Sequence, residues 1–274
     1  MRKESRGEPE RQKLVLERQL LGLSSVNNAR QLGGYRIGGK RVRPDVLLRS
    51  GALARLSAED AALLRDRYRV CCVYDLRSEE ERHPAPDVPV EGAEQMTLSA
   101  SLSSSQLPEG VDMNDMRSIL RFLLANAGTP LVQTACQQLY VRILFEEENQ
   151  RVLRRFLADV ARREGAVLWH CTQGKDRAGC ASAVLLAALG AGRDLLVQDF
   201  ALSAAFYDSL AAQVPTQTEE QRTVIQTLIT ANVPLFEAAL DEVDRRYGSM
   251  EAYLAECLGV TETLRRTLRD RFLE

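Results

Sequence analysis

One short stretch constrains this chain most, because an apolar segment runs through a compact polar loop into a helix. Residues 166–179 read AVLWHCTQGKDRAG. The apolar residues 166–170 predict a buried strand, and the alanine-rich run from Asp176 onward predicts a long helix. At such a strand–loop–helix junction, backbone N–H groups and the helix dipole converge, which favours the binding of an anion.

The rest of the chain fits an α/β fold in which helices flank a central sheet. Residues 70–75, VCCVYD, predict a second buried strand, and Ser57 is the expected N-cap of a helix over 58–68. A further strand is expected within 87–100. Helices are expected over 115–126, 131–145, 150–163, 193–211, 219–231, 234–247, 249–257 and 261–273.

Composition narrows the function classes. The 274 residues carry 36 Lys and Arg against 38 Asp and Glu, a formal net charge of -2, so no global field attracts nucleic acid or an anionic membrane. No apolar run reaches the roughly 18 residues of a membrane span, and the N-terminus lacks the apolar core of a signal peptide. We therefore expect a cytoplasmic protein, with export without a signal peptide left open. We treat 1–274 as one domain with a helical lead-in over 1–22.

Cysteine and histidine usage favours chemistry without a metal or cofactor. The six cysteines form no CxxC pair, so neither a zinc cage nor a disulfide scaffold is indicated. The only histidines are His83 and His170, too few for a histidine-rich metal site, whereas an all-carboxylate site stays open. We therefore expect no metal and no cofactor, and an anion must be bound by local groups.

The loop itself suggests the chemistry. Cys171 follows the strand, and Arg177 comes at the start of the helix, so the loop can curl with its amides toward one centre while Arg177 adds a bidentate donor. A helix N-terminus and a neighbouring arginine stabilise a thiolate, so we expect Cys171 to be a nucleophile. Attack on phosphorus gives a phosphocysteine, which water then hydrolyses. This is a two-step phosphomonoesterase.

These residues resemble a known family. His170, Cys171 and Arg177 match the HCx5R signature of cysteine-based protein tyrosine phosphatases, and HCTQGKDRAG is similar to the HCxxGKDRTG string of atypical bacterial members of the mycobacterial PtpB and Listeria LipA type. The segments NARQLGG, LLRSGAL, VYDLRSEEER and RRYGSMEAYLAECLGVTETLRRTLRDRF agree with that family. The resemblance spans roughly residues 26–273. It implies a cysteine-phosphatase-type sheet and favours a helical lid within 113–163 or 213–247.

The resemblance also implies roles for individual residues. Cys171 is the nucleophile, and Lys175 contacts the substrate anion, widening the positive mouth and favouring substrates with more than one phosphate. The leaving-group acid is Asp176, which we rank first, or Asp75 of the DLR segment, for which pairing with an arginine is about as well supported. His170 shapes the loop by hydrogen bonding. Phosphate or substrate binding falls to Arg177 and to Thr172, Gln173, Gly174, Lys175, Ala178 and Gly179.

Two residues depart from the family pattern. Ala178 stands where the family has Thr or Ser, whose hydroxyl assists the second step, so hydrolysis of the phosphocysteine is expected to be slow. Gln31 replaces the aspartate of NxRDLGG. Elsewhere, residues 79–82, EEER, read as a solvated helix start, Cys180 as a packing residue, and Cys72 as a candidate disulfide partner of oxidised Cys171.

The expected activity is therefore metal-independent hydrolysis of phosphotyrosine in proteins, with phosphoserine and phosphothreonine as further substrates. Three alternatives stay open: a phosphoinositide phosphatase, a weakly active module that binds phosphate esters because of Ala178, and a rhodanese-like sulfur or arsenate transferase. The partner is thus a phosphorylated protein or a phosphoinositide, with no nucleic acid and no integral membrane segment. The oligomeric state stays open.

Overall fold

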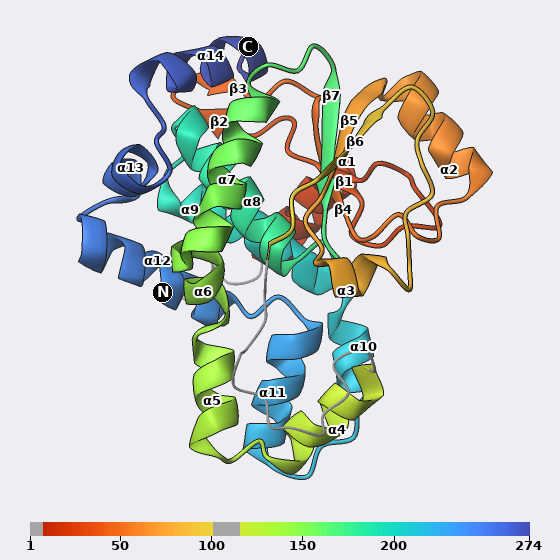
Figure 1. Ribbon diagram of the computed structural model, residues 1–274, viewed down its shortest axis with the longest axis vertical. Helices are drawn as coiled ribbons and strands as arrows, with labels where there is room; N and C mark the ends of the chain where they lie inside the picture. The colour runs from red at the N-terminus through yellow and green to blue at the C-terminus, as the bar shows by residue number, and fades with distance from the viewer. Residues whose placement is uncertain (1–7, 101–115) are drawn as a thin grey trace.

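The computed structural model describes residues 8–100 and 116–274, and its centre is a five-stranded mixed sheet (Figure 1). β1 runs antiparallel to β4, whereas β4, β7, β5 and β6 are parallel. Asp75 lies opposite His170 in the register of β5 and β7, so these strands end at one edge. The order is β1 (Arg30–Gln31), β4 (Leu47–Ser50), β7 (Ala166–His170), β5 (Val70–Asp75) and β6 (Glu94–Thr97).

The inner strands are apolar because both faces of the sheet are covered. Every residue of β7 is buried, and neighbouring residues point to opposite faces. Leu168 and Val73 belong to one hydrophobic cluster, whereas Trp169 and Tyr74 belong to the other. A parallel sheet buried in this way reads as a continuous apolar run, and both predicted inner strands are confirmed.

Helices cover the two faces unequally, and they confirm the predicted α/β class (Figure 1). The smaller cluster involves α2 (Ala58–Ala62) and the following π-helical turn η1 (Leu63–Arg67). The larger cluster surrounds α8 (Asp176–Leu189), of which all residues after Asp176 are buried. Around α8 lie α6 (Leu139–Phe145), α7 (Glu147–Val160), α9 (Arg193–Ala201), α12 (Val233–Tyr247) and α14 (Glu262–Phe272).

A third group of helices stands apart from the sheet, at the lower end of the view in Figure 1. Its own small core consists of Leu123, Ala127, Val132, Cys136 and Val224. The group therefore forms a separate packing unit beside the carboxyl edge of the sheet. Its helices are α4 (Met116–Ala125), α5 (Pro130–Gln137), α10 (Asp208–Ala212) and α11 (Glu219–Ile229).

The expected helices are present, with four interruptions, the first in the helix over 58–68, which begins as α2 and continues as the π-helical turn η1. The predicted helix over 131–145 breaks at Gln138, because α5 packs in the small core while α6 packs in the main one. The helix over 193–211 includes the 3-10 turn η2 (Leu202–Phe206). The helix over 249–257 begins as α13 (Met250–Ala252) and continues as the π-helical turn η3 (Tyr253–Cys257).

The remaining elements are short. The lead-in contains α1 (Glu8–Gln19), and α3 (Glu79–Arg82) follows β5. A separate hairpin joins β2 (Arg36–Ile37) and β3 (Lys40–Arg41). Within the described ranges, no single helix is long and apolar enough to cross a membrane, and α11 with α12 reaches that length only as a pair bent by 73°.

Candidate active site

The loop between β7 and α8 lies at the carboxyl edge of the sheet. Cys171 directly follows β7 and is 2% exposed, and α8 begins at Asp176. The loop therefore ends at the unpaired N–H groups of a helix N-terminus, where an anion is favoured. Gly174 has φ +69°, and a Cβ there would lie 2.1 Å from the carbonyl oxygen of Ser50. Only glycine fits this turn.

A carboxylate from α3 holds the loop arginine. Nη1 and Nη2 of Arg177 donate to Oε2 and Oε1 of Glu81 at 2.5 Å and 2.6 Å, and the Thr172 hydroxyl donates to Oε1 at 2.5 Å. Burial raises the pKa of Glu81, but the hydrogen bond and charge of Arg177 outweigh burial and bring it to about 2. The remaining nitrogen of the guanidinium, Nε of Arg177, is buried and makes no hydrogen bond to the described residues.

The EEER segment therefore differs from its expected role as a solvated helix start. Ser78 is the N-cap of α3, and Glu81 completes a capping box by accepting from the backbone N–H of Ser78 at 2.9 Å. One carboxylate thus serves both the helix start and Arg177. Glu79 and Glu80 are exposed, as predicted for the run.

Two carbonyl groups of the loop accept hydrogen bonds from side chains that lie behind it. The carbonyl oxygen of Gly174 accepts from Nδ2 of Asn28 at 2.9 Å and from Nη2 of Arg49 at 2.7 Å. The carbonyl oxygen of Gln173 accepts from the Tyr207 hydroxyl at 2.5 Å. In a trans peptide the N–H points opposite to the C=O, so the N–H groups that follow these carbonyls point to the front of the loop.

The side chains behind the loop also carry an excess of positive charge. Arg30 and Arg49 are fully buried, and each pairs with Asp199, at 2.5 Å and 2.6 Å. Burial, followed by the repulsion of Arg30, lowers the pKa of Arg49 to about 10, which leaves it protonated at neutral pH. Two cations thus share one carboxylate directly behind the loop.

Lys175 takes a different place from the one expected. Its side chain is 1% exposed, and Nζ donates to the carbonyl oxygens of Thr227 at 3.0 Å and Thr230 at 2.8 Å. These carbonyls belong to the C-terminal turn of α11, where unpaired oxygens attract a cation. Lys175 therefore links the loop to α11 rather than widening the positive mouth.

Asp176 lies between two polar neighbours. Its Oδ1 accepts from the Tyr140 hydroxyl at 2.9 Å, and its Oδ2 lies 3.4 Å from Nζ of Lys175. Burial, and then the charge of Asp176, raises the pKa of Tyr140 well above its usual value. Tyr140 therefore stays a donor to Asp176.

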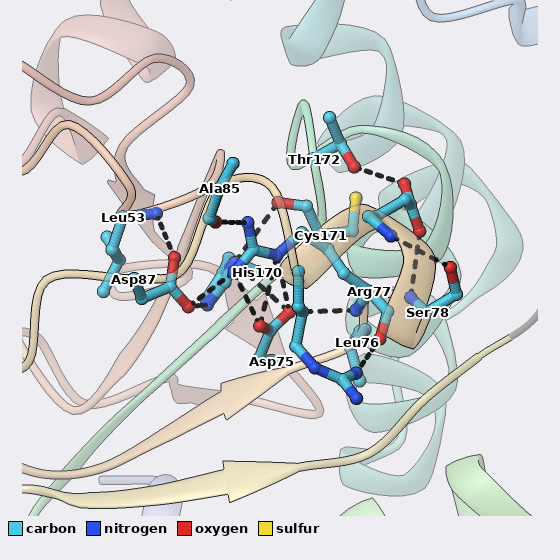
Figure 2. A network of polar contacts seen from close by, with 12 residues as sticks. Leu53, Asp75, Leu76, Arg77, Ser78, Ala85, Asp87, His170, Cys171 and Thr172 are labelled. Carbon is cyan, nitrogen blue, oxygen red and sulfur yellow. Dashed lines mark hydrogen bonds and ion pairs between the residues drawn. The ribbon is translucent and has the colours of Figure 1, made fainter. Parts of the chain in front are cut away.

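Asp75, the other predicted acid, belongs to a buried network with His170 (Figure 2). Its Oδ1 and Oδ2 accept from Nε and Nη2 of Arg77 at 2.9 Å and 2.7 Å, and Nη2 also lies 2.9 Å from Oδ2 of Asp87. Nε2 of His170 lies 3.0 Å from that same oxygen of Asp87. Asp75 thus pairs with the arginine of its own DLR segment, not with Arg177.

Oxygen and nitrogen atoms of Asp75, Asp87 and His170 lie close enough together to surround a metal ion. The guanidinium of Arg77 already contacts both carboxylates of this cluster. A cation brought to the same oxygens would meet the charge of Arg77 at close range. The donor set is therefore poorly suited to a metal.

The structure also locates the remaining predicted residues. Ala178 is buried, and its carbonyl oxygen accepts from the indole N–H of Trp169 at 3.1 Å. Gly179 faces the ring of Phe200, which a Cβ would approach to 2.9 Å. The side chain of Gln31 accepts from the Asp45 backbone N–H at 2.6 Å.

The structure separates Cys72 from Cys171 and places Cys180 in the core. Cys72 lies level with Val167 in the sheet, four residues before Cys171. At about 3.3 Å per residue this is roughly 13 Å along the strand, too far for a disulfide, which needs Cα atoms within about 7 Å. Cys180 is fully buried inside α8, as expected of a packing residue.

Sequence reasoning missed several residues that hold this site. Asn28 and Arg49 stand in the matched segments NARQLGG and LLRSGAL, which could have suggested a role for both. The capping-box spacing from Ser78 marks Glu81 only as a helix residue. Asp87 and Tyr207 lie in no recognised pattern, because only the fold brings them to the loop.

Comparisons with known proteins agree with this geometry. A protein of Cupriavidus necator, named as a candidate tyrosine-protein phosphatase, is 28% identical over 247 residues, covering 88% of this chain and 84% of its own length. The triple specificity protein phosphatase PtpB of Mycobacterium tuberculosis is 26% identical, and the match covers 85% of this chain and 92% of the relative's length. The model of the tyrosine phosphatase family matches residues 21–274. The chain therefore belongs to the tyrosine phosphatase family and is a phosphatase.

Proposed function

We propose that this phosphatase works through a cysteine nucleophile and acts mainly on phosphotyrosine in proteins. The observation that carries the proposal is the loop from Cys171 to Arg177, with a thiol at the end of β7 and a guanidinium in the first turn of α8. The buried Nε of Arg177 and the forward-pointing N–H groups of Gly174 and Lys175 are donors suited to a phosphate group.

The reaction then proceeds in two steps. Sγ of Cys171 attacks phosphorus in line; the S–P bond forms as the P–O bond to the leaving group breaks, and the leaving oxygen gains a proton. Water next attacks phosphorus and breaks the S–P bond, which releases phosphate and restores the thiolate. Arg177 and the loop N–H groups stabilise the non-reacting oxygens in both steps.

Asp176 is the better supported proton donor. It lies in the first turn of α8 with a side chain 14% exposed. Both oxygens of Asp75 accept from Arg77, and Oδ1 also accepts from the backbone N–H of Arg77 at 2.9 Å. Both oxygens of Asp75 are thus occupied by Arg77, so this carboxyl group is poorly placed to reach a leaving group.

A wider substrate range is part of the proposal. The mycobacterial relative is named for triple specificity, which supports more than one substrate class for this chain. The further substrates that we propose are phosphoserine, phosphothreonine and phosphoinositides. The burial of Lys175 weakens the earlier reason for favouring substrates with several phosphates. The cytoplasmic location and the single-domain organisation stay part of the proposal.

The predicted lid corresponds best to α4 and α5 from the first expected range and α11 from the second, together with α10, which precedes the second range. Two observations support this assignment: the C-terminal turn of α11 binds Lys175, and Tyr207, just before α10, binds Gln173. A cavity of about 490 Å³ between α10 and α11 reaches Thr230 beside the loop. Residues 113–115 of the expected lid range lie outside the described residues.

The test is turnover of p-nitrophenyl phosphate in the presence of EDTA, followed from the first turnover. Cys171→Ser should abolish release of p-nitrophenol while circular dichroism shows an intact fold. Turnover that survives this substitution, or that needs a metal, would contradict the cysteine mechanism.

The same assay addresses Ala178. If its missing hydroxyl slows hydrolysis of the phosphocysteine, a stoichiometric burst precedes a slower steady rate, and Ala178→Thr speeds the steady rate. A burst followed by no turnover would favour the phosphate-binding module instead. Persulfide transfer from thiosulfate would favour the rhodanese-like alternative.

A further inference from the structure

The peptide bond between Gly174 and Lys175 is held firmly from behind the loop. The Gly174 carbonyl oxygen accepts from Nδ2 of Asn28 at 2.9 Å and from Nη2 of Arg49 at 2.7 Å. The bond is trans, so the N–H of Lys175 points the opposite way, to the front of the loop. Because glycine restricts its own backbone little, the chain alone does not fix this direction. The two side-chain donors therefore decide where the Lys175 N–H points.

Asp199 of α9 sets the direction of Arg49. Nη1 of Arg49 donates to Oδ2 of Asp199 at 2.6 Å, while Nη2 of the same guanidinium donates to the Gly174 carbonyl. A guanidinium is a planar, rigid fork, so a carboxylate that fixes one of its nitrogens also fixes the other. The Arg49 and Asp199 side chains are 0% and 2% exposed. The position of Asp199 therefore determines where Nη2 of Arg49 lies.

The second donor depends on the same carboxylate. Nη1 of Arg30 donates to Oδ1 of Asp199 at 2.5 Å, and Nη2 donates to the Asp199 backbone carbonyl at 2.8 Å. Nε of Arg30 in turn donates to Oδ1 of Asn28 at 3.3 Å, which orients the amide so that its Nδ2 faces Gly174. Two routes from Asp199, one through Arg49 and one through Arg30 and Asn28, thus end on one carbonyl oxygen.

Asp199 is itself held as an anion. Its Oδ1 also accepts from the Tyr35 hydroxyl at 3.0 Å. Burial raises the pKa of Asp199, but the charges of Arg30 and Arg49 outweigh burial and lower the pKa below its usual value. An ionised carboxylate offers only acceptor sites, which suits the side chains that donate to it.

We propose that Asp199 is a positioning residue of the phosphate site. Through Arg49 and Asn28 it holds the Gly174 carbonyl backward, and so it keeps the Lys175 N–H directed at a phosphate oxygen. This inference rests on the proposed function, since only a loop that binds phosphate uses that N–H. Asp199 acts through other side chains and is therefore not a catalytic residue.

The first test measures the dissociation constant of inorganic phosphate by calorimetry, which needs no turnover. Asp199→Asn removes a negative charge behind the loop, so charge alone would tighten phosphate binding. Positioning predicts the opposite, because the loss of one hydrogen bond to a charged group weakens binding about tenfold. Asp194→Asn, at an exposed residue of the same helix, is the matched control and should leave the dissociation constant unchanged. Unchanged or tighter binding by a folded Asp199→Asn variant would refute the inference.

A second variant is needed in case Asp199→Asn does not fold, since that change leaves two buried arginines without their carboxylate. Arg49→Lys keeps every charge but replaces the planar fork by a single nitrogen. It should also weaken phosphate binding about tenfold, and circular dichroism checks the fold of each variant. An unchanged dissociation constant in folded Arg49→Lys would overturn the proposal.

The last test observes the Lys175 N–H directly by nuclear magnetic resonance. The chain contains four lysines, so ¹⁵N labelling of lysine gives four amide signals. The variants Lys3→Arg, Lys13→Arg and Lys40→Arg each remove one of the others, which assigns Lys175 by elimination. Added phosphate should move the Lys175 signal downfield in the unchanged protein, because the N–H then donates to a phosphate oxygen, and much less in Arg49→Lys.

The outcomes separate this inference from the proposed function. Phosphate that binds by calorimetry but leaves the Lys175 signal unmoved would contradict the positioning role alone. If no phosphate binds to the unchanged protein, the proposed function fails and the inference fails with it. The expected changes in a chain that does not hydrolyse p-nitrophenyl phosphate would support the positioning role and count against the proposed hydrolysis.

Discussion

Glu81→Gln tests how the loop arginine is held. The substitution removes the negative charge, while the amide oxygen of Gln still accepts from the backbone N–H of Ser78, so the capping box of α3 keeps its main bond. What is lost is the charged, bidentate contact with Arg177, whose side chain is 3% exposed. A buried guanidinium then faces a neutral amide.

The structure sets the size of this loss. The contact holds the pKa of Glu81 at about 2, against 4.5 for an ordinary glutamate, a difference of about 2.5 units or about 3.4 kcal/mol. The Glu81 side chain is 33% exposed, so solvent screening reduces this to about 2 kcal/mol of unfolding free energy at neutral pH. Because the folded-state pKa is the lower one, the stabilisation is complete above about pH 4.5 and fades as the pH falls toward 2.

Urea unfolding of Glu81→Gln and of the unchanged chain, at neutral pH and at about pH 3, measures the loss of unfolding free energy and its dependence on pH. Glu79→Gln is the matched control, because Glu79 is an exposed neighbour in the same helix, and it should unfold like the unchanged chain. A loss below about 0.5 kcal/mol at neutral pH, or a gap of the same size at both pH values, would refute the reasoning.

Two further substitutions probe the loop. Gly174→Ala should abolish p-nitrophenyl phosphate turnover in a chain that stays folded by circular dichroism, because φ is +69° and the Cβ would lie 2.1 Å from the carbonyl oxygen of Ser50; normal kcat would contradict this account. Asp176→Asn should lower kcat about 100-fold for aryl phosphates with poor leaving groups and much less for good ones, as a series of substituted phenyl phosphates would show. An equal loss across the series would exclude Asp176 as the proton donor.

Features that depend on neighbouring residues could be predicted from the sequence. The strands Val70–Asp75 and Ala166–His170 are short apolar runs, and Ser57 marks the start of α2 by its capping hydrogen bond. The spacing from Cys171 to Arg177 spans one loop, so its position at the strand–helix junction follows from local pattern alone.

Features that depend on partners far apart in the sequence could not be predicted from it. Glu81 lies 96 residues from Arg177, and Lys175 lies 55 residues from Thr230; no period in the sequence encodes such pairs. The charged run around Glu81 therefore read as solvated, and Lys175 read as part of the mouth. The break at Gln138 was missed for the same reason, because it depends on two separate hydrophobic cores.

The paired arginines behind the loop have a consequence for handling the protein. Arg30 and Arg49 share the single carboxylate of Asp199, so a buried positive charge lies behind the loop that we propose to bind phosphate. If the loop binds phosphate as proposed, then phosphate, sulfate or vanadate in a buffer is a ligand of the folded state, worth about 2.7 kcal/mol at a hundredfold excess over Kd. The melting temperature of this enzyme is thus a property of the protein together with its buffer anions, and comparisons between preparations require the same anions.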